Sequence, residues 1–168
     1  MTNIILIGYM GCGKSTIGVR LSYRLQQPFL DTDKMIETKK GCTISEIFDT
    51  EGEAAFRQLE TDCVRGLLSE KKWYVIATGG GLPVKEENRA ILKELGTVVY
   101  LRIRPETVYE RLKNDTSRPL LRGEDPLGKI RQMIGTRGPK YEACADVIVD
   151  VDGKSFEEII KEIEEKTA

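Results

Sequence analysis

The sequence contains no histidine. Without imidazole, the chain cannot use histidine to activate a nucleophile or to bind a metal ion, so acid–base chemistry must come from carboxylates, lysine or water. Its four cysteines, Cys12, Cys42, Cys63 and Cys144, form no C-x-x-C pair. This spacing disfavours a disulfide framework or a zinc site and favours reduced cysteines that serve as small packing residues.

Long apolar runs and an excess of one charge are also absent. No stretch approaches the length of a membrane span, and the N-terminus lacks the charged and then apolar pattern of a signal peptide, so we expect a cytoplasmic protein without a membrane partner. The 26 basic and 27 acidic residues leave a net charge of −1. This balance argues against nucleic acid held by bulk electrostatics, and an anionic substrate would need specific arginines.

The length and composition suit one globular domain. The chain has 168 residues, of which 40% are hydrophobic, and it has no repeat or low-complexity tract. Short apolar strands, expected at 3–7, 28–30, 73–77, 98–101 and 146–149, alternate with helical stretches. This alternation predicts an α/β protein with a parallel sheet and right-handed crossovers over residues 1–168.

Several helix ends can be recognised from the sequence. Capping boxes are expected at Thr43 with Glu46 and at Ser155 with Glu158. Asp125 precedes a proline as an N-cap would, and Gly96 stands where a helix would end.

Residues 8–16, GYMGCGKST, match the phosphate-binding loop G-x-x-x-x-G-K-[ST]. The loop follows the apolar run 4–7 and precedes a helical pattern, which is the context the motif needs and disfavours a merely structural glycine-rich turn. Lys14 is expected to reach the β- and γ-phosphates and Ser15 to bind Mg²⁺. The predicted nucleotide-binding residues here are Gly11, Cys12, Gly13, Lys14, Ser15 and Thr16.

Two further clusters follow the next two strands, and all three should meet at one edge of the sheet. Asp31 and Asp33 leave the second strand, and two buried carboxylates beside a triphosphate need a compensating cation or donor. We expect Asp31 to hold Mg²⁺ through water and Asp33 to accept a hydrogen bond from the attacking hydroxyl. The alternative makes Asp33 a helix N-cap and Asp31 a turn residue.

Three glycines, Gly79, Gly80 and Gly81, follow the third strand. They would let the backbone approach a ligand closely, and the alternative is a flexible connector.

Taken together, these motifs resemble the shikimate kinase family along nearly the whole chain. The resemblance rests on 8–16, D-T-D at 31–33, G-E-x-x-F-R-x-x-E at 52–60, T-G-G-G at 78–81, R-P-L-L at 118–121 and R-x-x-x-Y at 137–141. It implies five parallel strands in the order 2-3-1-4-5 in a three-layer α/β/α P-loop kinase fold. It also implies a substrate-binding region at about 32–60, a lid at about 113–124, and a monomer.

The resemblance further implies ATP-dependent phosphorylation of the shikimate 3-hydroxyl, with one Mg²⁺ per subunit. Arg57 and Arg137 correspond to arginines that hold the shikimate carboxylate, in a paired geometry that lysine does not reproduce. Asp33, Gly79 and Gly80 correspond to groups that contact the ring hydroxyls, and Glu60 is expected to orient Arg57. Phe48 and Phe56 resemble apolar walls of the same pocket.

At the nucleotide end, the resemblance makes Arg118 a lid arginine that closes over the phosphates and Arg111 a residue against the adenine. The predicted catalytic residues are therefore Asp33, Lys14 and Arg118. The segment 152–154 shows no family pattern, so base recognition there is left unassigned. Alternatives are a kinase for gluconate or a nucleoside monophosphate, and a nucleotide-binding switch protein, for which the guanine-reading N-K-x-D motif is missing.

Overall fold

The protein is described by a computed structural model that covers residues 1–114 and 123–168. The described elements, in chain order, are β1 (Asn3–Ile7), α1 (Lys14–Leu25), β2 (Phe29–Asp31), α2 (Thr32–Lys40), α3 (Ile44–Glu51), α4 (Glu53–Leu67), β3 (Val75–Ala77), the 3₁₀ helix η1 (Leu82–Val84), α5 (Glu86–Leu95), β4 (Gly96–Arg102), α6 (Pro105–Leu112), α7 (Pro126–Cys144), β5 (Val147–Asp150) and α8 (Phe156–Thr167).

The strands form one parallel five-stranded sheet in the order β2-β3-β1-β4-β5. This confirms the predicted fold class and strand order. All five residues of the central strand β1 are buried, because helices cover both faces of a parallel sheet and leave its middle strand no polar side. Each predicted strand is present, and the bounds differ by up to two residues.

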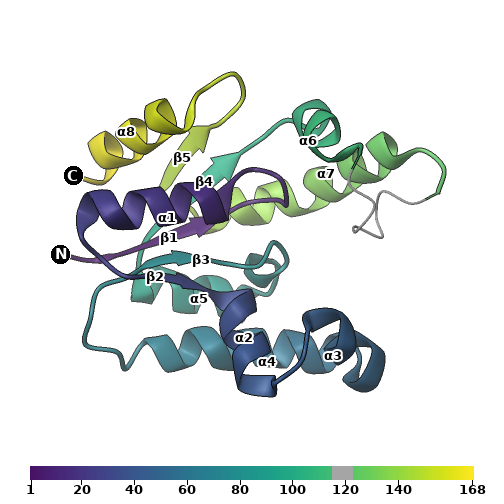
Figure 1. The fold of residues 1–168 in the computed structure, drawn as a ribbon, viewed down its shortest axis with the longest axis horizontal. Helices are drawn as coiled ribbons and strands as arrows, with labels where there is room; N and C mark the ends of the chain where they lie inside the picture. The colour runs from purple at the N-terminus through teal and green to yellow at the C-terminus, as the bar shows by residue number, and fades with distance from the viewer. Residues whose placement is uncertain (115–122) are drawn as a thin grey trace.

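Helices flank the sheet in two layers (Figure 1). On one face α1 packs against β2 and β3 and against α8, while on the other α5 and α7 pack against β4 and against each other. Because the sheet is parallel, β1 and β3 point the same way in Figure 1, and the loops after them lie together at the end of the molecule opposite both termini.

Helices α2, α3 and α4 form a group of their own below the β2–β3 side of the sheet (Figure 1). A small hydrophobic cluster of Ile36, Ile47 and Phe56 holds them together, apart from the main core. The predicted substrate-binding region, 32–60, corresponds to α2, α3 and the first part of α4. The predicted lid, 113–124, lies largely outside the described residues.

The predicted helix caps are present with one difference. Ser155 and Glu158 form a reciprocal capping box, and Asp125 accepts a hydrogen bond from the Gly128 N–H at the start of α7. At the start of α3, Thr43 Oγ1 accepts from the Glu46 N–H, which is one half of the predicted capping box. The carboxylate at this helix start comes from Glu37 and not from Glu46, and it accepts from the Ile44 N–H. Gly96 ends α5 in an extended conformation. Among the described helices, none is both long and apolar enough to cross a membrane.

Candidate active site

The carboxyl ends of β1, β2 and β3 border a cavity of about 840 Å³. Segments as far apart in the sequence as Met10 and Phe156 meet there, as expected for the edge of an open parallel sheet. The predicted site residues in its wall are Gly11, Gly13, Lys14, Ser15, Thr16, Asp31, Asp33, Arg57, Gly79, Gly80, Arg111 and Arg137. Of the other two, Cys12 does not line the cavity and Arg118 lies outside the described residues.

The phosphate-binding loop joins β1 to α1. Gly11 and Gly13 have φ of 80° and 94°, in the left-handed region that favours glycine, and Gly13 leads directly into the first turn of α1. No side chain caps this helix start, so its first N–H groups stay available to an anion.

The Lys14 side chain folds back over the loop. Its Nζ donates to the Gly8 carbonyl at 2.6 Å and to the Tyr9 carbonyl at 3.2 Å, and it lies 3.7 Å from the Cys12 sulfur. Cys12 is buried behind the loop with 1% of its surface exposed. Its thiol therefore packs against the core.

Asp31, and not Asp33, caps helix α2. Its Oδ1 accepts from the backbone N–H groups of Asp33 and Lys34, at 3.0 and 3.3 Å. The alternative that made Asp33 the N-cap is therefore wrong, because the helix begins at Thr32 and already contains Asp33. The second oxygen, Oδ2, lies 3.5 Å from the Ser15 hydroxyl. The two predicted magnesium ligands thus lie side by side at the phosphate loop.

Asp33 faces into the cavity as a half-buried carboxylate. Its Oδ1 is buried and has no hydrogen-bond partner within the described part of the chain. Burial raises the pKa of Asp33, the charge of Asp31 raises it further, and Lys14 lowers it. An acceptor in this position is suited to a hydroxyl donor from a ligand, because an unpaired buried oxygen is costly.

Arg57 is held by two carboxylates of its own helix, α4. Its Nη1 pairs with Glu60 Oε1 at 2.7 Å and its Nη2 with Glu53 Oε1 at 3.3 Å. Glu60 is 1% exposed, and burial raises its pKa even though Arg57 pulls in the opposite direction. The predicted orientation of Arg57 by Glu60 is thus present in the structure, and Glu53 is a second partner that was not predicted.

Gly79 and Gly81 permit close approaches that any side chain would block. A methyl group on Gly81 would lie 2.8 Å from Arg57 Cζ, and one on Gly79 would lie 2.6 Å from Asp33 Oδ1 and 3.1 Å from Glu60 Oε2. The latter two oxygens are both buried and have no partner among the described residues, so two unsatisfied acceptors face the same α-carbon. Close approach, and not flexibility, is the reason for these glycines.

Arg137 reaches the same cavity from α7. Its guanidinium stands 6.0 Å from the centre of the Tyr9 ring, and a methyl group on Gly80 would lie 3.5 Å from its Nη1. No carboxylate of the described residues lies within ion-pair distance of Arg137. A second cavity of about 660 Å³ shares Arg57, Gly81 and Arg137 with the first, so the two arginines stand between adjoining spaces.

The walls at the two ends of the cavity differ in character. Near Asp33, Phe48 and Phe56 form a tilted ring pair with centroids 5.0 Å apart, as apolar walls at the predicted substrate end. At the other end, Arg111 donates to the Gly11 carbonyl at 2.7 Å. Lys154, the last residue of the segment that the sequence left unassigned, also lines this end, together with Ser155 and Phe156.

Comparison with known proteins gives a consistent result. The family model described as shikimate kinase matches residues 10–168. A shikimate kinase from Symbiobacterium thermophilum is 42% identical over 167 residues, covering 98% of this chain and 95% of that protein. One from Francisella tularensis subsp. novicida is 44% identical over 161 residues, covering 96% and 92%.

Solved structures agree with the sequences. Shikimate kinase from Acinetobacter baumannii in complex with shikimate superposes with a TM-score of 0.90 at 39% identity, covering 98% of this chain and 92% of that chain. A gluconokinase from Sinorhizobium meliloti has a TM-score of 0.62 at 19% identity, covering 99% and 91%, which shows a common fold alone. The phosphate loop, the acidic segment, the glycine segment and the two arginines thus occur in a chain that belongs to the shikimate kinase family.

Proposed function

We propose that this protein transfers the γ-phosphoryl group of ATP to the 3-hydroxyl of shikimate. The observation that carries the proposal is the single cavity of about 840 Å³ that contains Lys14, Asp33, Arg57 and Arg137. A triphosphate at the loop and a small carboxylic acid at the arginines would therefore lie within reach of each other. Gluconate also carries a carboxylate, but the G-E-x-x-F-R run with Arg57 and the later Arg137 follow the shikimate kinase pattern.

The nucleotide end supports the first half of the reaction. The open start of α1 offers N–H donors and the positive end of a helix dipole to the phosphates. Lys14 would exchange its two carbonyl partners for phosphate oxygens when ATP binds. Arg111 and the segment from Lys154 to Phe156 would flank the base. Arg118 enters this proposal from the family resemblance alone.

The oxygens near the loop fit a magnesium ion. Ser15 Oγ and Asp31 Oδ2 are hard oxygens only 3.5 Å apart. Ser15 would bind the ion directly and Asp31 through water, and phosphate oxygens and further water would fill the remaining positions, which Mg²⁺ favours. Bound there, the ion would neutralise charge on the β- and γ-phosphates. Because Asp31 Oδ1 also caps α2, the carboxylate is held in place before any ion arrives.

Asp33 supplies the acceptor for the attacking hydroxyl. Its unpaired Oδ1 would accept the hydrogen bond of the 3-hydroxyl and so orient the oxygen toward the γ-phosphorus. The new oxygen–phosphorus bond forms as the bond to the β,γ-bridging oxygen breaks, ADP departs, and the hydroxyl proton passes to Asp33. Arg57 and Arg137 would hold the shikimate carboxylate, with Glu60 fixing the Arg57 plane from behind.

A coupled assay for ADP release tests the proposal. Shikimate, gluconate and AMP would be offered separately with ATP and Mg²⁺, and the phosphorylated position would be identified by NMR. We expect turnover with shikimate alone and phosphate on the 3-oxygen. Faster turnover of gluconate or AMP, or ADP release that shikimate does not stimulate, would overturn the assignment. We further propose a monomer in the cytoplasm that uses only small-molecule substrates, which size-exclusion chromatography and cell fractionation would check.

A further inference from the structure

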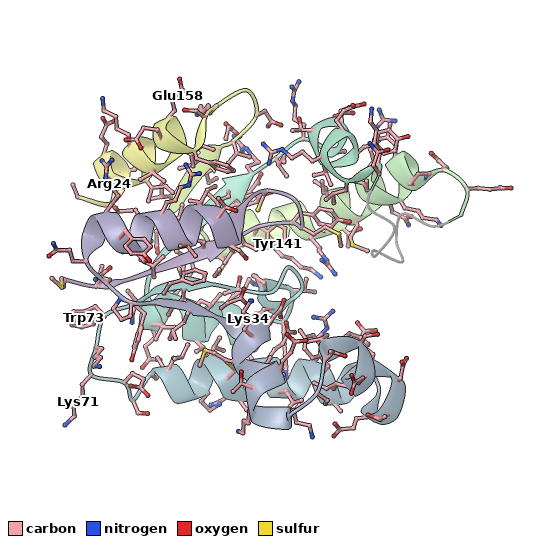
Figure 2. All side chains as sticks on the ribbon, viewed as in Figure 1. Arg24, Lys34, Lys71, Trp73, Tyr141 and Glu158 are labelled. Atoms are coloured by element: carbon pink, nitrogen blue, oxygen red, sulfur yellow. The ribbon has the colours of Figure 1, made fainter. Side chains whose placement is uncertain are left out.

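The glycine segment after β3 is held by two hydroxyls, those of Thr32 and Tyr141, whose motifs gave them no role in the sequence. Thr32 Oγ1 accepts the Gly79 N–H at 3.1 Å, and the Tyr141 hydroxyl donates to the Gly80 carbonyl at 2.5 Å. Both side chains have 0% of their surface exposed. They come from opposite parts of the chain, since Thr32 opens α2 and Tyr141 lies near the end of α7, inside the molecule (Figure 2).

Most backbone N–H and C=O groups of residues 79–81 have hydrogen-bond partners within the protein. The Gly79 and Gly81 carbonyls accept from the Leu82 and Val84 N–H groups, both at 3.1 Å. With the Thr32 and Tyr141 bonds, four of the six groups of residues 79–81 are paired. The remaining two are the N–H groups of Gly80 and Gly81, which have no acceptor within the described part of the chain. Backbone donors are rarely left without a partner, so a ligand or water must complete them.

Those two donors sit among the positive charges of the cavity. The Gly81 α-carbon lies against the Arg57 guanidinium, and the Gly80 α-carbon faces Arg137 Nη1. Two N–H groups beside two guanidinium groups offer hydrogen-bond donors to the carboxylate and hydroxyls of a bound acid. Because the carbonyls of the segment and the Gly79 N–H are engaged by the protein, the Gly80 and Gly81 N–H groups are the ones left for a ligand.

We propose that the hydroxyls of Thr32 and Tyr141 are positioning groups that hold residues 79–81 so that the Gly80 and Gly81 N–H groups face the bound acid. This inference rests on the proposed function, because it assumes that the acid bound at Arg57 and Arg137 is the phosphoryl acceptor. Thr32 sets the near end of the segment against α2. Tyr141 ties the middle of the segment to the helix that carries Arg137, so the donors and the arginine keep a fixed relation.

The chemistry of both hydroxyls suits this task. Burial raises the pKa of Tyr141, although Arg137 beside it acts in the opposite direction, so the phenol stays protonated and donates. The ring is also packed, since it lies 5.1 Å from the Tyr100 ring in a tilted pair. Removing the phenol oxygen therefore deletes a bond to Gly80 while the packing surface remains.

Tyr141→Phe and Thr32→Val are the variants that test the inference, with Thr32→Ser and Tyr100→Phe as matched controls. Tyr100 is 3% exposed and packs on Tyr141, but within the described part of the chain residues 79–81 take their side-chain hydrogen bonds from Thr32 and Tyr141 and not from Tyr100, so Tyr100→Phe reports loss of a buried phenol oxygen alone. Each test variant leaves one backbone group unpaired, which should raise KM for shikimate roughly tenfold. KM for ATP should stay within about twofold of the parent value. Thr32→Ser keeps the hydroxyl and should restore parent behaviour.

Two measurements keep the outcome decisive. Calorimetric titration with shikimate in the absence of ATP should show the same loss of affinity in both test variants, and amide exchange at Gly79 should speed up in Thr32→Val but not in Thr32→Ser. Unchanged affinity, or an equal loss in Tyr100→Phe, would overturn the positioning role.

If the parent protein binds shikimate without phosphorylating it, the proposed function fails while the affinity series still decides the role of the hydroxyls. If the parent does not bind shikimate, both fail. If a test variant does not fold, the other one with its control decides.

Discussion

Gly81→Ala isolates the contribution of Arg57 orientation to substrate binding. The backbone at Gly81 has φ of −88° and ψ of −10°, a conformation open to alanine, so the substitution brings no backbone strain. The new methyl group would instead lie 2.8 Å from both Cζ and Nη2 of Arg57 and closer still to Nη1. Since carbon and nitrogen atoms pack at about 3.5 Å or more, the guanidinium must retreat by more than about half an ångström.

That displacement acts on a group with little room to adapt. Arg57 Nη1 is bonded to Glu60, which is 1% exposed and cannot follow into solvent. A misplacement on the order of 1 Å near a reacting substrate can cost about a hundredfold in rate. We therefore expect kcat/KM for shikimate to fall by about 10- to 100-fold, chiefly through KM, with KM for ATP unchanged within about twofold.

Steady-state kinetics with each substrate varied in turn measure this effect. Gly135→Ala is the matched control, because Gly135 lies on α7 with open space at its Cβ position, and there alanine should leave kinetics unchanged and stabilise the helix by about 0.5–1 kcal/mol. A Gly81→Ala enzyme with parent KM for shikimate would refute the reasoning that Arg57 must sit against this glycine to bind the acid.

Four other predictions concern charge and buried polar groups. Asp33→Asn should lower kcat by orders of magnitude while ATP still binds. Burial and the charge of Asp31 raise the pKa of Asp33, so the ligand-free protein should also lose stability as pH rises from the ordinary aspartate pKa through the raised one. This pH dependence should weaken in Asp33→Asn. Parent and variant melting points that change equally across that pH range would contradict the prediction. Asp31→Asn keeps an equally good N-cap, so stability should hold while the Mg²⁺ concentration for half-maximal rate rises about tenfold; an unchanged Mg²⁺ titration would remove Asp31 from the metal site. Glu53→Gln frees Arg57 from an exposed competing carboxylate and should lower KM for shikimate by about two- to fivefold, whereas a higher KM would make Glu53 a support of Arg57. Asn3→Leu leaves the Leu95 carbonyl and the Tyr74 N–H unpaired and should cost about 2–4 kcal/mol of unfolding free energy, seen as a melting point about 5–15 °C lower; an unshifted melt would count against that bond pair.

The predictable parts of the fold are those that short-range chemistry specifies. The run 4–7 in β1 reads as a buried strand because every residue in it is apolar, and the G-x-x-x-x-G-K-S pattern needs only the strand before it and the helix after it. The caps at Asp125 and Ser155 depend on a bond to a residue three positions ahead. Such interactions are complete within a few residues, so a local pattern contains them.

Other parts needed contacts between distant segments. The sequence offered Asp33 as a possible N-cap and Asp31 as a turn residue, and the cap proved to be Asp31 because α2 starts directly after the end of β2. The Thr32 and Tyr141 bonds to the glycine segment span 47 and 61 residues, and neither residue type signals such a partner. The second carboxylate on Arg57 belongs to Glu53, four residues earlier on the same helix. Sequence spacing permits this pair, but it does not show that Glu53 would compete with a substrate carboxylate for the Arg57 guanidinium.

By itself, the sequence determined the chemical groups and their local frame: a phosphate loop, a pair of aspartates, a glycine segment, and the family to which they belong. The tertiary structure alone decided which of these groups share one cavity, which oxygens are left unpaired at Gly79, and which hydroxyls hold the glycine segment. The physical reason is distance. Helix starts and loop conformations arise from neighbours along the chain. Burial, the pKa of a side chain and the presence or absence of a hydrogen-bond partner depend on residues that only the packed sheet and its helices bring together.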